Sequence, residues 1–426
     1  MKKYLSGLFL FATLMSFSQT EKIDSLLAVL QLENPDSTKI IILNTLGTLT
    51  MNSNQSQAIS YFSQAENIFN SHPGLPTKLN AETKYRKANV YVLMGDYGKA
   101  LEYSKSSFEK CKTNADYPLQ IKNLNLIGRV YFYKGDYEKA LEYYFRALRE
   151  EEKLDDKKQI ALSHSNLGNV YFAMGDPKKS LQYFQSSLSL FKDLNDKPGL
   201  QRSFNNTGLA YSSLNISDSA IAYFSKSEKM AKELNDKNGI AHAEENIAAE
   251  EMKRGNTSAA LDQYMKSLVI REEIGDKMGI SNTQLKAGKL LLEKYKKWKD
   301  PADLKKAETY FLSSLSIAKE LSSMNALMDN YDALSKLAEA KGDYKSAYLN
   351  YKTYITYRDS IMNEENARKA MQVRMQFEYD RKEQEIELLK QENKLKELEL
   401  EREKQEMKLE ELKKENQEKS KKKKEK

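Results

Sequence analysis

The feature that most limits how this chain can fold is a repeat of 40 residues. Gly128, Gly168 and Gly208 are spaced at this interval, and Ala248 and Gly288 continue the series. Aromatic residues recur at the same interval, three and sixteen residues after these positions: Tyr131, Tyr171 and Tyr211, then Tyr144, Phe184, Phe224 and Tyr264. Self-similarity at such a period is typical of a solenoid, in which each unit buries its apolar face against its neighbours.

Each unit is predicted to be a pair of amphipathic helices joined by a short turn. Within residues 160–199, the segments ALSHSNLGNVYFAM and KKSLQYFQSSLSLFKDL both show the apolar periodicity of a helix. The turn is predicted at residues 175–177, Gly-Asp-Pro, with Pro177 in the first turn of the second helix. The stretch NLGNVYFAMGD at residues 166–176 is therefore a helix and its turn, since a phosphate-binding loop would need a preceding strand.

Small residues are predicted to let the two helices approach each other closely. Gly168 and Ser180 stand where the helices should cross, and Tyr171 and Phe184 should fill the space beside the crossing. Successive units end in LNDKPG, LNDKNG and IGDKMG, and we expect the final glycine to end the second helix in the left-handed conformation. These glycines are Gly199, Gly239 and Gly279.

The pattern resembles the tetratricopeptide repeat, in its 40-residue variety. The resemblance covers about eight units over residues 36–359 and is strongest at residues 121–199. It implies an all-α fold, an α-solenoid of helix-turn-helix repeats. The pair Lys87-Ala88 departs from the usual apolar-glycine pair, and residues 293–306, EKYKKWKDPADLKK, are predicted to be an insertion. Residues 19–35 are predicted to form a helix that caps the first repeat.

The amino terminus has the features of an export signal. Residues 1–18 combine Lys2 and Lys3 with a short apolar stretch and small residues before a cleavage site. This predicts a signal peptide cleaved after Ser18, and a protein that is periplasmic or secreted. An uncleaved membrane anchor is the alternative, although the apolar stretch is shorter than the roughly 20 residues of a spanning helix.

The carboxyl-terminal region is predicted to be a long charged helix with coiled-coil character, over residues 360–420. Residues 381–418 contain no Gly or Pro, and Leu388, Leu395 and Leu409 follow a seven-residue step. The helix either pairs in a parallel homodimer or stands alone, stabilised by Glu–Lys pairs. The basic tail at residues 421–426, KKKKEK, could contact anionic lipid or an acidic partner, or form a solvated end.

An exported repeat array followed by such a helix resembles the sensory half of bacterial membrane-bound signalling proteins. In that family the helix leads to a membrane span and then to a histidine kinase, phosphatase, cyclase or DNA-binding domain. The sequence here ends in lysines, so the resemblance implies a signalling context without catalytic activity.

Composition and motifs favour a protein that is not an enzyme. The chain has 17 Gly, 7 Pro and a formal charge of +7, which suits a helical protein and does not favour nucleic acid as a partner. With Cys111 as the single cysteine, no internal disulfide can form. Neither catalytic motifs nor metal-ligand spacing around the three histidines is present, so no metal or cofactor is expected. The pairs Glu244-Glu245 and Glu250-Glu251 are expected to be solvated.

Asparagine recurs on the first helices without a packing reason. Asn166, Asn206 and Asn246 each precede the apolar-small pair of their unit, although asparagine is a mediocre helix former. In the tetratricopeptide family, first helices line a concave groove where asparagines hold a bound peptide, so the resemblance implies a peptide or protein partner. The predicted groove residues are Asn89, Asn125, Arg129, Phe132, Tyr133, Asn166, Asn169, Phe172, Arg202, Asn205, Asn206 and Asn246. The alternative is that the asparagines bond to adjacent helices.

Two functions remain open at this point. The first is a non-enzymatic scaffold that binds a peptide or protein in the groove, in signalling at the cell envelope. The second is a detached sensor subunit that controls a separately encoded histidine kinase or phosphatase.

Overall fold

The computed structural model describes residues 19–72, 74–113 and 116–361, all of which belong to one compact unit spanning residues 1–368. These residues form helices, turns and short connections, and none of them lies in a strand. The predicted signal peptide, nearly all of the predicted helix at 360–420 and the basic tail lie outside the described residues.

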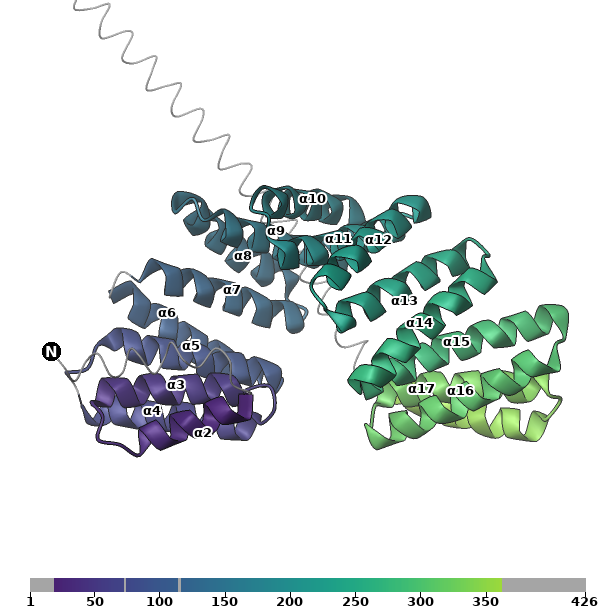
Figure 1. Ribbon diagram of the computed structural model, residues 1–426, viewed down its shortest axis with the longest axis horizontal. Helices are drawn as coiled ribbons and strands as arrows, with labels where there is room; N and C mark the ends of the chain where they lie inside the picture. Colours follow the sequence, from purple (N-terminus) through teal and green to yellow (C-terminus); the bar gives the residue numbers. More distant parts are fainter. Residues whose placement is uncertain (1–18, 73, 114–115, 362–426) are drawn as a thin grey trace, which may run out of the picture. The chain divides into compact units, whose positions relative to one another are not determined.

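From α3 onward the described helices form eight consecutive pairs (Figure 1). We call the first helix of each pair an A helix and the second a B helix. The A helices are α3 (Asp36–Thr50), α5 (Thr77–Leu93), α7 (Tyr117–Tyr133), α9 (Lys157–Ala173), α11 (Lys197–Ser213), α13 (Lys237–Lys253), α15 (Lys277–Trp298) and α17 (Met324–Ala340). The B helices are α4 (Gln55–Ser71), α6 (Tyr97–Thr113), α8 (Tyr137–Lys153), α10 (Pro177–Asp193), α12 (Ser217–Glu233), α14 (Thr257–Ile274), α16 (Pro301–Glu320) and the helix at 344–361. Before them, α2 (Gln19–Leu30) packs against α3.

Each helix packs against the helices next to it in the chain. A helices also touch the next A helix, as α5 does with α3 and α7, and α13 with α11. Contacts confined to each helix pair and the pairs next to it in the chain define a solenoid, in which stability is the sum of unit and interface terms. The predicted α-solenoid of helix pairs is therefore confirmed.

The small residues act as the sequence predicted. A Cβ built on Gly168 would lie 2.5 Å from Cδ1 of Phe184, so only glycine lets this ring enter between α9 and α10. Phe184 is 2% exposed and Ser180 is fully buried. The ring of Tyr171 stacks on Tyr183 with centroids 5.4 Å apart. The same glycine–ring contact recurs between Gly128 and Tyr144, Gly208 and Phe224, and Gly288 and Phe311.

The turn within the unit was also predicted correctly. Gly175 adopts φ +78°, Asp176 caps α10 by accepting from the Lys179 N–H, and Pro177 is the first residue of the helix.

The prediction for the end of the B helices was wrong. The left-handed residues are Asn195, Asn235 and Gly275, with φ of 50°, 53° and 70°. Gly199 instead lies in the first turn of α11, and Gly239 and Gly279 occupy the same place in α13 and α15. Asparagine tolerates the left-handed region, which leaves the following aspartate free to cap the next helix.

That aspartate sets where each A helix begins. Asp196 accepts the Gly199 N–H at 2.8 Å, and Asp236 accepts the Gly239 N–H at 3.0 Å. The units therefore start about three residues before the predicted boundaries; α9, for example, begins at Lys157 rather than Ile160. Gly199 is required for a different reason than predicted, because a Cβ there would lie 2.2 Å from the Phe191 ring.

Candidate functional site

All twelve predicted groove residues lie on five successive A helices, α5, α7, α9, α11 and α13. We call the surface that they form the A-face. Consecutive members within each helix are three or four residues apart, or are immediate neighbours, which keeps them on one side of the helix. The question is which of these side chains are already used by the fold.

Most of the polar side chains on the A-face bond to the neighbouring A helix. Arg129 donates from Nη2 to Oδ1 of Asn89 at 2.6 Å. Asn246 donates to Oδ1 of Asn205 at 2.9 Å, and Asn206 donates to the Ser165 hydroxyl at 3.3 Å. Each bond joins residues 40 or 41 positions apart, one repeat along the chain. These asparagines therefore form hydrogen bonds between adjacent units. This agrees with the alternative interpretation, in which the asparagines bond to adjacent helices.

Asn125 is also engaged, in a buried contact between three helices. Its amide donates to Oε1 of Glu151 on α8 at 2.9 Å, and Ser163 on α9 donates to its carbonyl oxygen at 3.4 Å. Glu151 is fully buried, and burial raises the pKa of its carboxyl group. Asn125 thus satisfies one oxygen of a buried carboxyl group, and Oε2 of Glu151 has no hydrogen-bond partner among the described residues.

Asn166 and Asn169 on α9 differ from the others. Neither side chain has a hydrogen bond within the described part of the chain, and Asn169 is exposed. Beside them along α9, Phe172 is 38% exposed, and on the preceding A helix Tyr133 is 52% exposed. Arg202 on α11 is likewise exposed, whereas Phe132 is half-buried against Tyr133 and Tyr137. The unused polar groups of the A-face are therefore concentrated on α9.

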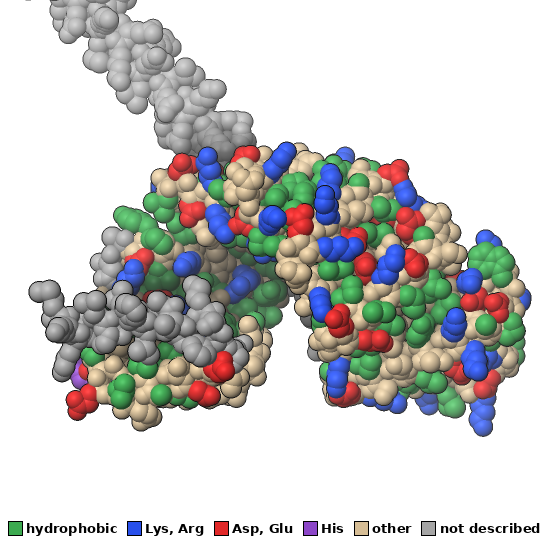
Figure 2. All heavy atoms as spheres, viewed as in Figure 1, with side chains coloured by type: hydrophobic (Ala, Val, Ile, Leu, Met, Phe, Trp, Pro, Cys, Tyr) green, Lys and Arg blue, Asp and Glu red, His purple; other side chains and the backbone are tan. Residues whose placement is uncertain are grey.

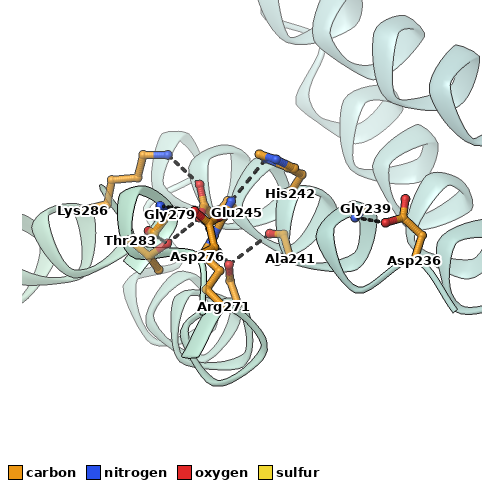
Figure 3. A network of polar contacts seen from close by, with 11 residues as sticks. Asp236, Gly239, Ala241, His242, Glu245, Arg271, Asp276, Gly279, Thr283 and Lys286 are labelled. Carbon is orange, nitrogen blue, oxygen red and sulfur yellow. Dashed lines mark hydrogen bonds and ion pairs between the residues drawn. The ribbon is translucent and has the colours of Figure 1, made fainter. Parts of the chain in front are cut away.

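A second set of polar residues, which the sequence did not predict, lies between α13, α14 and α15 (Figure 3). Glu245 is its centre: Oε1 accepts from Arg271 Nε at 2.7 Å and from the Thr283 hydroxyl at 2.5 Å, and Oε2 accepts from Lys286 at 2.9 Å. Arg271 also pairs with Asp276, the N-cap of α15, and faces Nδ1 of His242 at 3.2 Å. The network fixes the positions of three consecutive helices.

The electrostatics of this network follow from its charges. Burial alone would raise the pKa of Glu245, but Lys286, Thr283 and Arg271 together lower it, so the carboxylate is charged. Burial and the Arg271 guanidinium both lower the pKa of His242, which keeps the imidazole neutral and able to accept. All hydrogen-bonding groups on Glu245 are therefore matched by donors, which is the condition for a stable buried ion pair.

The expectation that the glutamate pairs of α13 are solvated was wrong. Glu244, Glu245 and Glu250 are 4%, 7% and 1% exposed. The sequence did contain one signal of this buried network. Arg271 occupies the repeat position that Phe191 and Ala231 hold 80 and 40 residues earlier. A charged residue therefore stands at a core position and needs a buried partner.

Within the described residues, no three side chains from His, Cys, Asp and Glu are grouped so that they could hold a metal ion. None of the described helices is both long and apolar enough to cross a membrane. On the face shown in Figure 2, acidic and basic side chains are interspersed.

A sequence profile of the tetratricopeptide repeat matches residues 79–149 and 159–233, which are helix pairs α5–α6 to α11–α12. This chain contains tetratricopeptide repeats. The matched residues include all of the A-face except Asn246. A search of curated proteins found no match in sequence.

Solved structures resemble this tetratricopeptide-repeat protein in fold. The apo form of RapI is 15% identical, with a TM-score of 0.55, over 81% of this chain and 98% of that one. A Rap protein complexed with competence and sporulation factor is 15% identical, with a TM-score of 0.53, over 81% and 99%. A signal transduction ATPase with a tetratricopeptide repeat sensor, from Pyrococcus horikoshii, is 16% identical, with a TM-score of 0.55, over 78% and 55%.

Proposed function

We propose that this tetratricopeptide-repeat protein is a non-enzymatic interaction scaffold that binds a peptide or protein segment on its A-face. The observation that carries the proposal is the contrast on that surface. Asn89, Asn125, Asn205, Asn206 and Asn246 bond within the fold, whereas Asn166 and Asn169 do not. A solenoid that left these two amides to water would gain nothing from them, because asparagine is a poor helix former.

The chemistry of α9 suits an extended peptide. An asparagine side chain carries both a donor and an acceptor, so it can pair with a backbone N–H and C=O whatever the partner's side chains are. Asn166 and Asn169 are three residues apart and therefore adjacent on the helix surface. The exposed rings of Phe172 and Tyr133 add apolar area of the kind that dominates binding energy at interfaces. The Rap protein structure with its bound factor is a precedent for a ligand on this fold.

We further propose that the protein acts after export, in signalling at the cell envelope. Support comes from the composition of residues 1–18 and from the resemblance of the whole arrangement to the sensory half of membrane-bound signalling proteins. In the second version of this function, the protein is a separate sensor subunit of a histidine kinase or phosphatase.

The test is affinity capture from the native cell envelope, with partners identified by mass spectrometry. We compare the full chain with the double variant Asn166→Ala/Asn169→Ala and with Asn67→Ala, a matched change at an exposed position on the B helix α4. We expect the double variant to lose the partner at an unchanged melting temperature, and Asn67→Ala to retain it. Recovery of a kinase or phosphatase would support the sensor version.

Equal capture by all three proteins would refute the A-face as the binding surface. Loss of the partner together with a lower melting temperature would show that the two asparagines are structural.

A further inference from the structure

The turn between α15 and α16 extends beyond the equivalent turns of the array. α15 has 22 residues, whereas the A helices α5 to α13 have 17 each. Because Asp276 caps α15 at the same repeat position as Asp236 caps α13, the extra residues lie at the carboxyl end of α15. At 1.5 Å per residue they carry this end about 7 Å beyond its neighbours. We call residues 293–306, which span this end and the start of α16, the lysine tip.

The lysine tip exposes the only tryptophan of the chain. Trp298 is the last residue of α15 and is 53% exposed. Lys297 Nζ lies 4.7 Å from the centroid of its ring, and Lys299, which ends the helix at φ +59°, lies 5.3 Å from the ring of Tyr295. No packing role in the described array explains why so large an apolar ring points away from the core.

The tip also carries positive charge that the fold does not neutralise. It contains six lysines, three acidic residues and no arginine. Lys294 pairs with Asp303 at 3.1 Å, and Lys296 pairs with Glu293 at 2.7 Å. No carboxylate among the described residues lies within ion-pair distance of the remaining lysines, which are Lys297, Lys299, Lys305 and Lys306. The third acid, Asp300, caps α16 through the Ala302 N–H.

We propose that the lysine tip docks on the surface of an anionic phospholipid bilayer. Tryptophan prefers the depth of the lipid headgroups, where its ring is partly apolar and its N–H can still be hydrated. Lysine is a compact point charge on a flexible stem, which suits a diffuse array of headgroups. Specific recognition of a carboxylate or phosphate in a protein or nucleic acid generally uses the planar fork of arginine, and the tip has none.

Trp298 makes the test direct, because its fluorescence reports on the tip alone. The full chain is mixed with vesicles of phosphatidylcholine, and with vesicles of phosphatidylcholine and phosphatidylglycerol. We expect a shift of emission to shorter wavelength only with the anionic vesicles, quenching by lipids brominated on their acyl chains, and reversal by salt. Emission that stays unchanged while the protein floats with the anionic vesicles would place binding elsewhere in the chain and overturn the proposal.

Two variants test whether the lysines of the tip bind the vesicles, or whether exposed lysines anywhere on the protein contribute equally. Lys297→Gln/Lys299→Gln retains the tryptophan, and we expect its vesicle partition coefficient to fall about 25-fold, since each lysine near an anionic surface contributes about fivefold. The control is Lys134→Gln/Lys192→Gln, at the exposed lysine that follows α7 and an exposed lysine of α10, neither of which makes an ion pair within the described residues. An equal fall in both variants would refute the tip. So would a blue shift with soluble polyglutamate but not with vesicles, which would indicate an acidic protein as the partner.

Discussion

Arg271 donates from Nε to Oε1 of Glu245 at 2.7 Å, across the interface between α14 and α13, and both side chains are almost completely buried. The two residues are 26 positions apart, and Lys286 on α15 completes the contact from the next unit. A single buried carboxylate thus connects three helices that no single unit could hold together alone.

The first prediction concerns this pair. Arg271→Ala leaves Glu245 buried without its closest cation, so we expect a loss of about 3 kcal/mol in the free energy of unfolding. Lys286→Ala removes a side chain that is 48% exposed, and its loss should stay below about 1 kcal/mol. Urea unfolding, with hydrogen exchange across α13 to α15, measures both. Similar losses in the two variants would contradict the role assigned to burial.

A second prediction concerns Gly199 and Asn195, the two residues that could each have provided the left-handed position after α10. Gly199→Ala places a methyl group against the buried ring of Phe191, and overpacking of this kind costs about 1–3 kcal/mol. Asn195→Gly replaces a left-handed asparagine by glycine, which adopts this conformation readily. It should change the free energy of unfolding by less than about 1 kcal/mol. Thermal melts of the two variants measure both losses; a larger loss for Asn195→Gly than for Gly199→Ala would contradict the overpacking expected at the Phe191 ring.

A third prediction distinguishes bonded from unbonded asparagines on the A-face. Asn246→Ala removes the bond to Asn205 and should cost about 1 kcal/mol. Asn166→Ala removes no bond within the described residues and should be neutral or slightly stabilising, because alanine is the better helix former. The double variant Asn205→Ala/Asn246→Ala provides a mutant cycle, and additive losses would show that the two side chains do not interact.

A fourth prediction is a pH dependence centred on Glu244. Burial, with Glu228 nearby, raises the pKa of this carboxyl to about 7; Lys232 and Lys266 act in the opposite direction, and Asp262 also faces it. The folded state therefore holds the proton more tightly than the unfolded state, so this contribution to stability is present at low pH and lost as pH rises to about 7.

Glu244→Gln should remove that dependence. We expect the variant to match the parent protein near pH 4 and to exceed its stability by about 3 kcal/mol at pH 8. Melting temperatures of both proteins measured across this range give the comparison, and a constant difference at all pH values would exclude titration of Glu244 as the cause.

The fold could be predicted from the sequence because its determinants are periodic. Gly168 and Phe184 are 16 residues apart, and the same spacing recurs in unit after unit, so one steric requirement appears many times over. The turn at Gly175 could also be predicted, because a left-handed glycine and an aspartate cap depend only on neighbours in the chain.

The tertiary structure decided what local signals left open. Gly199 and Asn195 both satisfy the chemistry of a helix end, and the position of the Phe191 ring made the choice. Which asparagines are free depended on the lateral register of adjacent A helices, because Asn246 finds its acceptor 41 residues away while Asn166 finds none among the described residues. A repeat pattern specifies which faces pack together, but hydrogen bonds across that packing need distances that only the assembled helices define.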